Sequence, residues 1–249
     1  MLTLKLLLVP TFLLLVSLAS KRWGPSVAGW LGGLPVVTGP ILFFIGIERG
    51  EAFASSAASA SLSAVFAAVV FSVAYSHAAQ FMSWIRALLL ALPAWGIAAF
   101  FLSLLPSSVA LSLVVACFTL LVAPWFFPIT KVLPGRYAIS TIELFCRMLS
   151  GTVLTVGVTV AADRLGSHWS GLLAVFPSVS IVLAVFSHRT HGPLFVAALL
   201  RSMAIGLYSF AAFCFALSCA LFHVGIVTAS GIAVGLAITV QSVTKNLLR

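Results

Sequence analysis

The chain has very little charge. Only 7% of its 249 residues are charged, and only 4 residues are acidic. A soluble domain carries about 25% charged residues, so these few ionisable groups cannot cover a surface in water. Because 62% of the residues are hydrophobic and the mean hydropathy is +1.24, the composition predicts an all-α, polytopic transmembrane helical bundle.

The chain also lacks the motifs of common enzyme and metal sites. It has no HExxH, GxSxG or P-loop sequence, and no carboxylate lies in the middle of an apolar run. The four cysteines lack CxxC spacing, and His188 and His191 have no evident third ligand nearby in the sequence. We therefore predict no enzymatic activity, no cofactor and no metal, although an enzyme acting on lipid is kept as a rival.

A net charge of +9 would suggest nucleic-acid binding in a soluble chain. Here the basic residues stand singly in short connections between apolar runs, which is typical of a membrane topology signal. We predict no nucleic-acid partner. The first apolar run is followed by Lys21 and Arg22 and is interpreted as a retained span rather than a cleaved signal.

A helix needs about 20 mainly apolar residues to cross a bilayer. Scanning the chain with this template predicts nine spans, with the weakest boundary at the short turn between the fourth and the fifth. The predicted spans are 2–20, 26–47, 52–76, 82–105, 108–128, 141–162, 169–187, 193–221 and 225–244.

Alternate connections between these spans differ in basic residues. One side receives eight Lys and Arg residues and the other receives three, and the second side also holds Glu48, Glu51 and Asp163. The positive-inside rule makes the first side cytoplasmic. We therefore predict a multi-pass protein of the bacterial inner (cytoplasmic) membrane, with the N-terminus outside and the C-terminus inside.

The two halves of the chain are similar to each other at a constant offset of 142 residues, with no gap. We call residues related by this offset counterparts. Five spans separate equivalent elements, so the two copies must cross the membrane in opposite directions, as in the inverted repeats of many transporters. The clearest matches are Arg22/Arg164, Gly24/Gly166, Gly29/Gly171, Pro35/Pro177, Gly50/Gly192 and Phe53/Phe195.

The repeat divides the chain into three parts. Residues 1–105 form the first repeat, with spans one to four, and residues 141–249 form the second repeat, with spans six to nine. Residues 106–140 hold the connecting fifth span and a cytoplasmic loop. The expected architecture is therefore 4 + 1 + 4. Duplication can also be a solution to folding alone, without alternating access to a transport site.

Two segments resemble the GlpM-type small inner-membrane proteins: 29–53, which contains Glu48-Arg49-Gly50, and 171–188. Members of that family are about half as long as this chain and carry a Gly- and Pro-containing span followed by an ERG-like turn. The resemblance implies two such halves, 2–105 and 141–244, fused in opposite orientation. It implies little about chemistry, and the second copy has His188-Arg189-Thr190-His191-Gly192 where the first has Gly46-Ile47-Glu48-Arg49-Gly50.

Pro35 and its counterpart Pro177 interrupt the second and seventh predicted spans. A proline removes one main-chain donor, so a carbonyl four residues earlier loses its helical partner. That carbonyl, together with the hydroxyls of Thr38, Ser178 and Ser180, can bind a solute. The alternative is a simple kink in which the hydroxyls satisfy the backbone. The Gly32-Gly33 pair would let another helix approach closely.

Two arginines lie well away from the ends of predicted spans, where a charge is costly and needs a partner or a function. Arg201 is nine positions into span eight and is the candidate for binding an anion, unless it is paired structurally. Arg147, also assigned to substrate binding, can pair with Glu143 four residues earlier. Glu48 and Arg49 at an external turn are assigned to a gate, with a plain solvated turn as the alternative.

These features favour a transporter for a small, weakly anionic solute, with a site between spans two and seven and alternating access of two inverted halves. The partners are the lipid bilayer and the solute, and a homo-oligomer is compatible with the sequence. The rival hypothesis is a non-transporting membrane scaffold, or an assembly factor for an envelope or polysaccharide pathway.

Overall fold

The computed structural model describes residues 2–106, 108–129, 137–165 and 176–248, which are mainly helical and contain no strand. The first half contains α1 (Leu2–Trp23), α2 (Pro25–Gly32), α3 (Thr38–Arg49), α4 (Glu51–Ser63), α5 (Val65–Ala78) and α6 (Trp84–Ser103). The remainder contains α7 (Val109–Phe126), α8 (Thr141–Leu165), α10 (Ser178–His191), α11 (Pro193–Ala220), α12 (Ile226–Thr244) and the 3₁₀-helix η1 (Lys245–Leu248).

Seven helical stretches of the described chain are long and apolar enough to cross a membrane. Each coincides with a predicted span, and α6 and α7 are separate helices on either side of the weakest predicted boundary. The prediction of a membrane-type helical bundle is therefore confirmed. The predicted spans 26–47 and 169–187 are not among the seven, and residues 169–175 of the latter lie outside the described residues.

The predicted span 26–47 consists of two half-helices, α2 and α3, separated by the non-helical residues 33–37. Pro35 causes the break because it lacks a main-chain donor and disfavours a helical conformation in the residue before it. Pro40 lies in the first turn of α3, where its missing N–H group is tolerated. Pro177 lies directly before Ser178, the first residue of α10.

Counterpart elements have nearly the same bounds in the two halves. Gly50 separates α3 from α4 and Gly192 separates α10 from α11, with φ angles of 89° and 85° that favour glycine. The residue before each glycine packs on a phenylalanine four positions later. The Arg49 guanidinium lies 5.2 Å from the Phe53 ring centroid, and the His191 and Phe195 rings stack at 4.4 Å.

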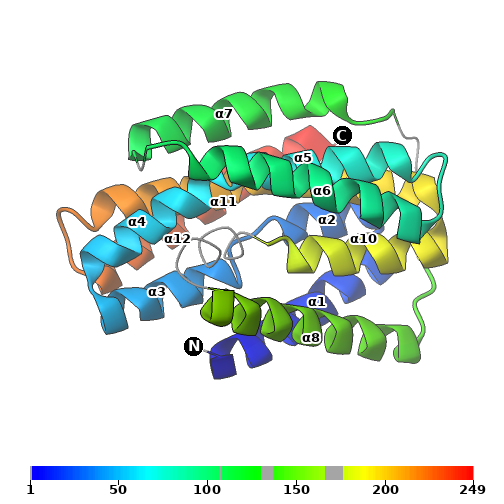
Figure 1. The fold of residues 1–249 in the computed structure, drawn as a ribbon, viewed down its shortest axis with the longest axis horizontal. Helices are drawn as coiled ribbons and strands as arrows, with labels where there is room; N and C mark the ends of the chain where they lie inside the picture. The colour runs from blue at the N-terminus through cyan, green and yellow to red at the C-terminus, as the bar shows by residue number, and fades with distance from the viewer. Residues whose placement is uncertain (1, 107, 130–136, 166–175, 249) are drawn as a thin grey trace.

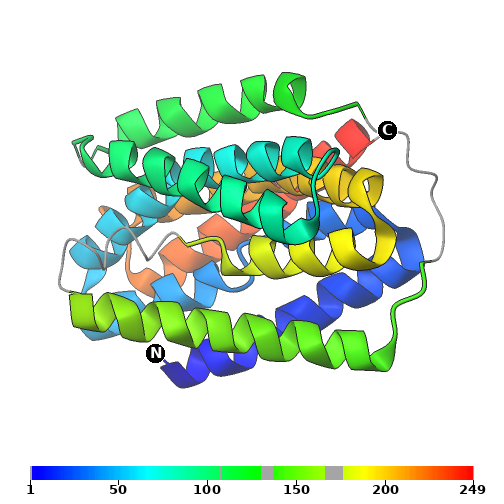
Figure 2. The ribbon, with the colours of Figure 1, turned by 45° about the vertical axis from the view of Figure 1, so that its right-hand side comes forward.

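Counterpart helices run in opposite directions in the molecule. Figure 1 shows α1 and α8 antiparallel along the lower side, and α3 and α10 running from the middle toward opposite ends. The turned view agrees (Figure 2). In it α6 and α12 are also antiparallel, and α5 and α11 lie between them. The connecting helix α7 lies across α4, α5 and α11.

The half-helix α2 packs closely on α11 through glycine. A Cβ atom placed on Gly29 would overlap the Leu199 carbonyl, and one on Gly33 would overlap the backbone of Gly206. Gly29 and Gly33 form a small-xxx-small pair, which allows two helix backbones to approach closely in a membrane. This contact fixes the position of α2, and with it the start of the break.

Two side-chain bonds from α12 hold the end of α2. The Gln241 amide donates to the Trp30 carbonyl at 3.0 Å, and the Trp30 indole N–H donates to the Thr244 hydroxyl at 3.1 Å. The last carbonyls of a helix have no intrahelical partner and need another donor, which Gln241 supplies here. The non-helical break therefore begins at an anchored helix end.

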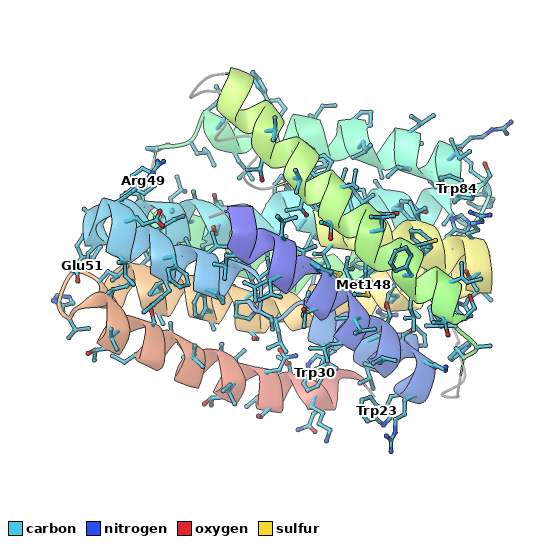
Figure 3. All side chains as sticks on the ribbon, turned by 90° about the horizontal axis from the view of Figure 1, so that it is seen from below. Trp23, Trp30, Arg49, Glu51, Trp84 and Met148 are labelled. Atoms are coloured by element: carbon cyan, nitrogen blue, oxygen red, sulfur yellow. The ribbon has the colours of Figure 1, made fainter. Side chains whose placement is uncertain are left out.

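Most of the described charges lie at the two ends of the bundle. One end, which we call the basic end, holds Lys21, Arg22, Arg86, Arg189 and Lys245. In Figure 3 the labelled residues Trp23 and Trp84 lie at the basic end, and Arg49 and Glu51 lie at the opposite end. At that opposite end, a Glu51 carboxylate oxygen accepts a bond from the Ile226 N–H at 3.1 Å and so caps α12.

Two counterpart stretches of 28 residues lie side by side, Glu51–Ala78 and α11. Helices α4 and α5 of the first stretch meet at Ala64, which keeps helical φ and ψ angles and the helical main-chain bonds to Ala60 and Ala68. Gly206, the counterpart of Ala64, lies inside α11. The Ser55 hydroxyl donates to the Ser218 carbonyl at 2.9 Å, so the two stretches are also joined near the opposite end.

Replacing Gly206 by alanine should destabilise the fold, because the new Cβ would meet the Trp30 carbonyl and lie 3.0 Å from the Gly33 Cα. Overpacking of this kind costs about 1–3 kcal/mol. Gly235→Ala is the matched control, since a Cβ at Gly235 has no neighbour within 4 Å and alanine favours a helix. The measurement is thermal unfolding in detergent, and equal melting temperatures for the two variants would contradict the close packing.

Candidate functional site

A cavity of about 370 Å³ lies where the break between α2 and α3 meets the start of α10. Residues of α1, α4, α5, α8 and α11 complete its wall. The volume is at the lower end of the range typical of small-molecule sites. Non-helical backbone at membrane depth is tolerated only where it is buried in protein or lines such a space.

The wall of the cavity is built from both halves of the chain in corresponding positions. Six positions of the first half line it together with their counterparts 142 residues later. These pairs are Leu34/Phe176, Val37/Val179, Thr38/Ser180, Ser61/Met203, Val65/Leu207 and Ala68/Phe210. Both halves of the chain therefore contribute to the cavity at matching positions.

The cavity wall holds hydrogen-bonding groups without partners. The N–H groups of Thr38 and of its counterpart Ser180 stand at the starts of α3 and α10, and neither has an acceptor among the described residues. The Thr155 hydroxyl of α8 is buried and lacks a partner there too. The Ser180 hydroxyl makes only a weak bond, to the Met203 sulfur at 3.8 Å.

Four of the five proline and hydroxyl residues predicted for the site meet at this cavity: Thr38, Pro177, Ser178 and Ser180 line it. Pro35 belongs to the break beside the cavity and is not one of its lining residues. The lining is otherwise mainly apolar, and the described part of it contains no charged side chain.

Arg201 lies outside the described cavity lining. It precedes Tyr208 by seven residues, which puts both on the same face of α11. The Tyr208 hydroxyl donates to the Leu120 carbonyl of α7 at 2.9 Å, so this face is directed toward α7. Met203, which lines the cavity, is two residues from Arg201 and therefore points to roughly the opposite side of the helix.

Arg147 also lies outside the cavity lining, and it is 1% exposed. Its guanidinium forms the ion pair with Glu143 that the sequence predicted, with a nitrogen–oxygen distance of 2.6 Å. It also donates to the Ser17 hydroxyl of α1 at 3.4 Å and lies 5.8 Å from the Phe186 ring centroid of α10. The buried cation is thus paired and bonded, as a charge at membrane depth requires.

Glu48 and Arg49, assigned to a gate from the sequence, are exposed at the end of α3. They lie at the end of the bundle opposite the basic end, away from the described cavity lining. Arg49 packs on Phe53 rather than on the cavity wall.

Sequence reasoning missed several lining residues, among them Ser61, Thr155 and Met203. The constant offset could have found one pair, since Ser61 and Met203 are counterparts and Ser61 lies in a serine-rich run. Thr155 gave no such signal, because its counterpart Leu13 is apolar.

Comparison of the chain with protein-family models, with curated proteins and with solved structures finds no match to any of them.

The basic end contains a partly buried histidine, His191, at the end of α10. One ring nitrogen, Nε2, donates to the Ala138 carbonyl at 3.1 Å, and Nδ1 is buried without a partner among the described residues. Burial lowers the pKa of His191 below its ordinary value of 6.5, and nearby Arg147 adds to this. The Ala138 bond and the charge of Glu143 act in the opposite direction.

This lowered pKa predicts that acid destabilises the protein. The unfolded chain binds a proton at His191 near pH 6.5, whereas the folded chain resists it, so stability falls as the pH drops below that value. His191→Gln, which keeps a donor for Ala138, should remove part of the fall. Melting temperatures measured between pH 7.5 and about 5 test this, and parallel curves for the two proteins would contradict it.

Proposed function

We propose that this protein is a membrane transporter for a small anionic solute, which binds in the central cavity and is reached alternately from the two sides. The observation that carries the proposal is the cavity wall, which contains six counterpart pairs and lies where the α2–α3 break meets the start of α10. If the two halves are an inverted repeat, each can adopt the conformation of the other, and the site then opens to the other side of the membrane. The two states contain similar contacts, so their energies are similar.

The inverted repeat is part of the proposal. It is supported by the offset of 142 residues, by the matching bounds of counterpart helices and by the opposite directions of α1 and α8, α3 and α10, and α6 and α12. Two of the glycines at positive φ, Gly50 and Gly192, are counterparts at this offset. Nine membrane crossings would follow if α2 with α3, and α10 with the residues before it, each count as one.

The unpaired groups at the cavity favour an anion. The starts of α3 and α10 both face the cavity, and the amino end of a helix carries a partial positive charge with free N–H donors. The Thr38, Thr155 and Ser178 hydroxyls can donate as well. Because the rest of the described wall is mainly apolar and includes Phe176 and Phe210, a small monocarboxylate with an apolar body fits this chemistry.

The proposed setting is the bacterial inner membrane, with the basic end in the cytoplasm. The excess of Lys and Arg at that end supports this orientation through the positive-inside rule. The resemblance to the GlpM-type proteins remains a proposal about ancestry and adds no chemistry to the site.

Thiol labelling tests whether the cavity is accessible from water. In a variant without the four native cysteines, Thr38→Cys should react with a charged, membrane-impermeant thiol reagent added to either side of membrane vesicles. Ser72→Cys is the control, since Ser72 is buried outside the described cavity lining and should stay unreactive. A Thr38→Cys variant that is folded but unreactive from both sides would indicate a dry core and favour a scaffold.

Transport itself is tested with purified protein in liposomes and radiolabelled acetate, benzoate, phosphate and sulfate. We expect uptake of a monocarboxylate, and Thr155→Val should reduce it by about tenfold, as loss of one bond to a charged group does. Thr152→Val on the same helix is the control, because the Thr152 hydroxyl bonds only to the Met148 carbonyl in the described structure. No uptake of any of the four anions would contradict the proposal.

A further inference from the structure

The Arg147 side chain joins three helices that also form the wall of the cavity. Through Glu143 the guanidinium is bound to its own helix, α8, and through Ser17 and Phe186 it contacts α1 and α10. Ser17 and Arg147 are 0% and 1% exposed, so water is excluded from the bond between them, whereas the Glu143 side chain is 12% exposed. The same three helices supply Val9, Val158 and Val179 to the cavity.

The register of these helices puts the contact between the cavity and the basic end. Val158 is eleven residues beyond Arg147 on α8, and Val179 is seven residues before Phe186 on α10, so each pair shares a helical face. These separations correspond to about 16 Å and about 10 Å along the helices. In Figure 3 Met148, next to Arg147, lies between the middle of the bundle and the end marked by Trp84.

The counterparts of the residues in this contact stand in different settings. The counterpart of Ser17 is Thr159, which lines the cavity itself. Phe186 is partly buried over Arg147, whereas its counterpart Phe44 is 41% exposed. The side chain of Lys5, the counterpart of Arg147, lies outside the described residues.

A buried, paired cation is suited to a contact that must open and close. Glu143 and Arg147 lie on the same helix, so the ion pair moves with α8 when that helix separates from α1 and α10. In the closed contact the carboxylate neutralises a guanidinium that is 1% exposed, where an unpaired charge would be costly. Once the helices part and water enters, the guanidinium is solvated and depends much less on Glu143.

From this geometry we infer that Arg147, with Glu143, Ser17 and Phe186, is the gate that closes the central cavity at the basic end. Opening toward that end moves α8 away from α1 and α10, and breaks the Arg147–Ser17 bond and the contact with Phe186. The released guanidinium then faces the path of a leaving anion. The inference rests on the proposed transport site, because it assigns the closure of that same cavity.

The test uses the Thr38→Cys protein and the same charged thiol reagent, added only to the basic-end side of the vesicles. Two variants weaken the gate: Glu143→Gln leaves Arg147 without its anion, and Ser17→Ala removes one bond with little change in packing. Each should raise the labelling rate from the basic end. For Glu143→Gln we expect about a tenfold rise, because an unpaired guanidinium is costly in the closed, buried contact and is solvated in the open one. The rate from the opposite side should not rise.

Arg189→Gln is the matched control, because Arg189 is an exposed cation at the same end, and it should leave both rates unchanged. Melting temperatures identify any variant that is unfolded, and Ser17→Ala keeps the test available if Glu143→Gln does not fold. Folded variants that label at the parent rate from the basic end would overturn the gate and leave the transport site intact. No labelling of Thr38→Cys from either side in any variant would overturn both.

Discussion

The main-chain hydrogen bond in hydrocarbon is the constraint on which this structure depends. Every N–H and C=O group at membrane depth needs a partner, and the α2–α3 break removes several at once. The protein satisfies one side of the break with Gln241, which bonds the Trp30 carbonyl, and fixes it through the close contact of Gly33 with Gly206. The other side, at Thr38, is left open toward the cavity. The packing of α2 and the cavity thus lie on the two sides of the same break in the helix.

The bundle contains few charged residues, and most of them lie where water or a partner stabilises the charge. The described cations and acids lie mostly at the two ends, where water solvates them. The exception that is fully buried, Arg147, is bonded on three sides and keeps Glu143 beside it. Arg201 is only partly buried on a face of α11 directed toward α7. A position deep in a predicted span therefore indicates that an arginine is either paired or functional. The helix face on which the arginine lies decides between the two.

Much of the fold could be read from the sequence, because its signals are local. Apolar length gives the seven long helices, the i,i+4 spacing gives the Glu143–Arg147 pair, and Pro35 and Pro177 mark the interruptions around which the cavity forms. What could not be read is which face of each helix meets which neighbour. That depends on tertiary contacts, such as those of the α2 glycines with α11. These contacts place Arg201 outside the cavity lining, and Thr155 and Met203 within it.

The continuity of α11 has a consequence for the stiffness of the two halves. An unbroken helix of 28 residues is about 42 Å long and transmits a displacement at one end to the other. Its counterpart, the stretch Glu51–Ala78, has the same length, and helical main-chain bonds to Ala60 and Ala68 run through Ala64 at its centre. A shift at one end of either stretch is therefore carried to the other end of the bundle, past the cavity that both stretches line.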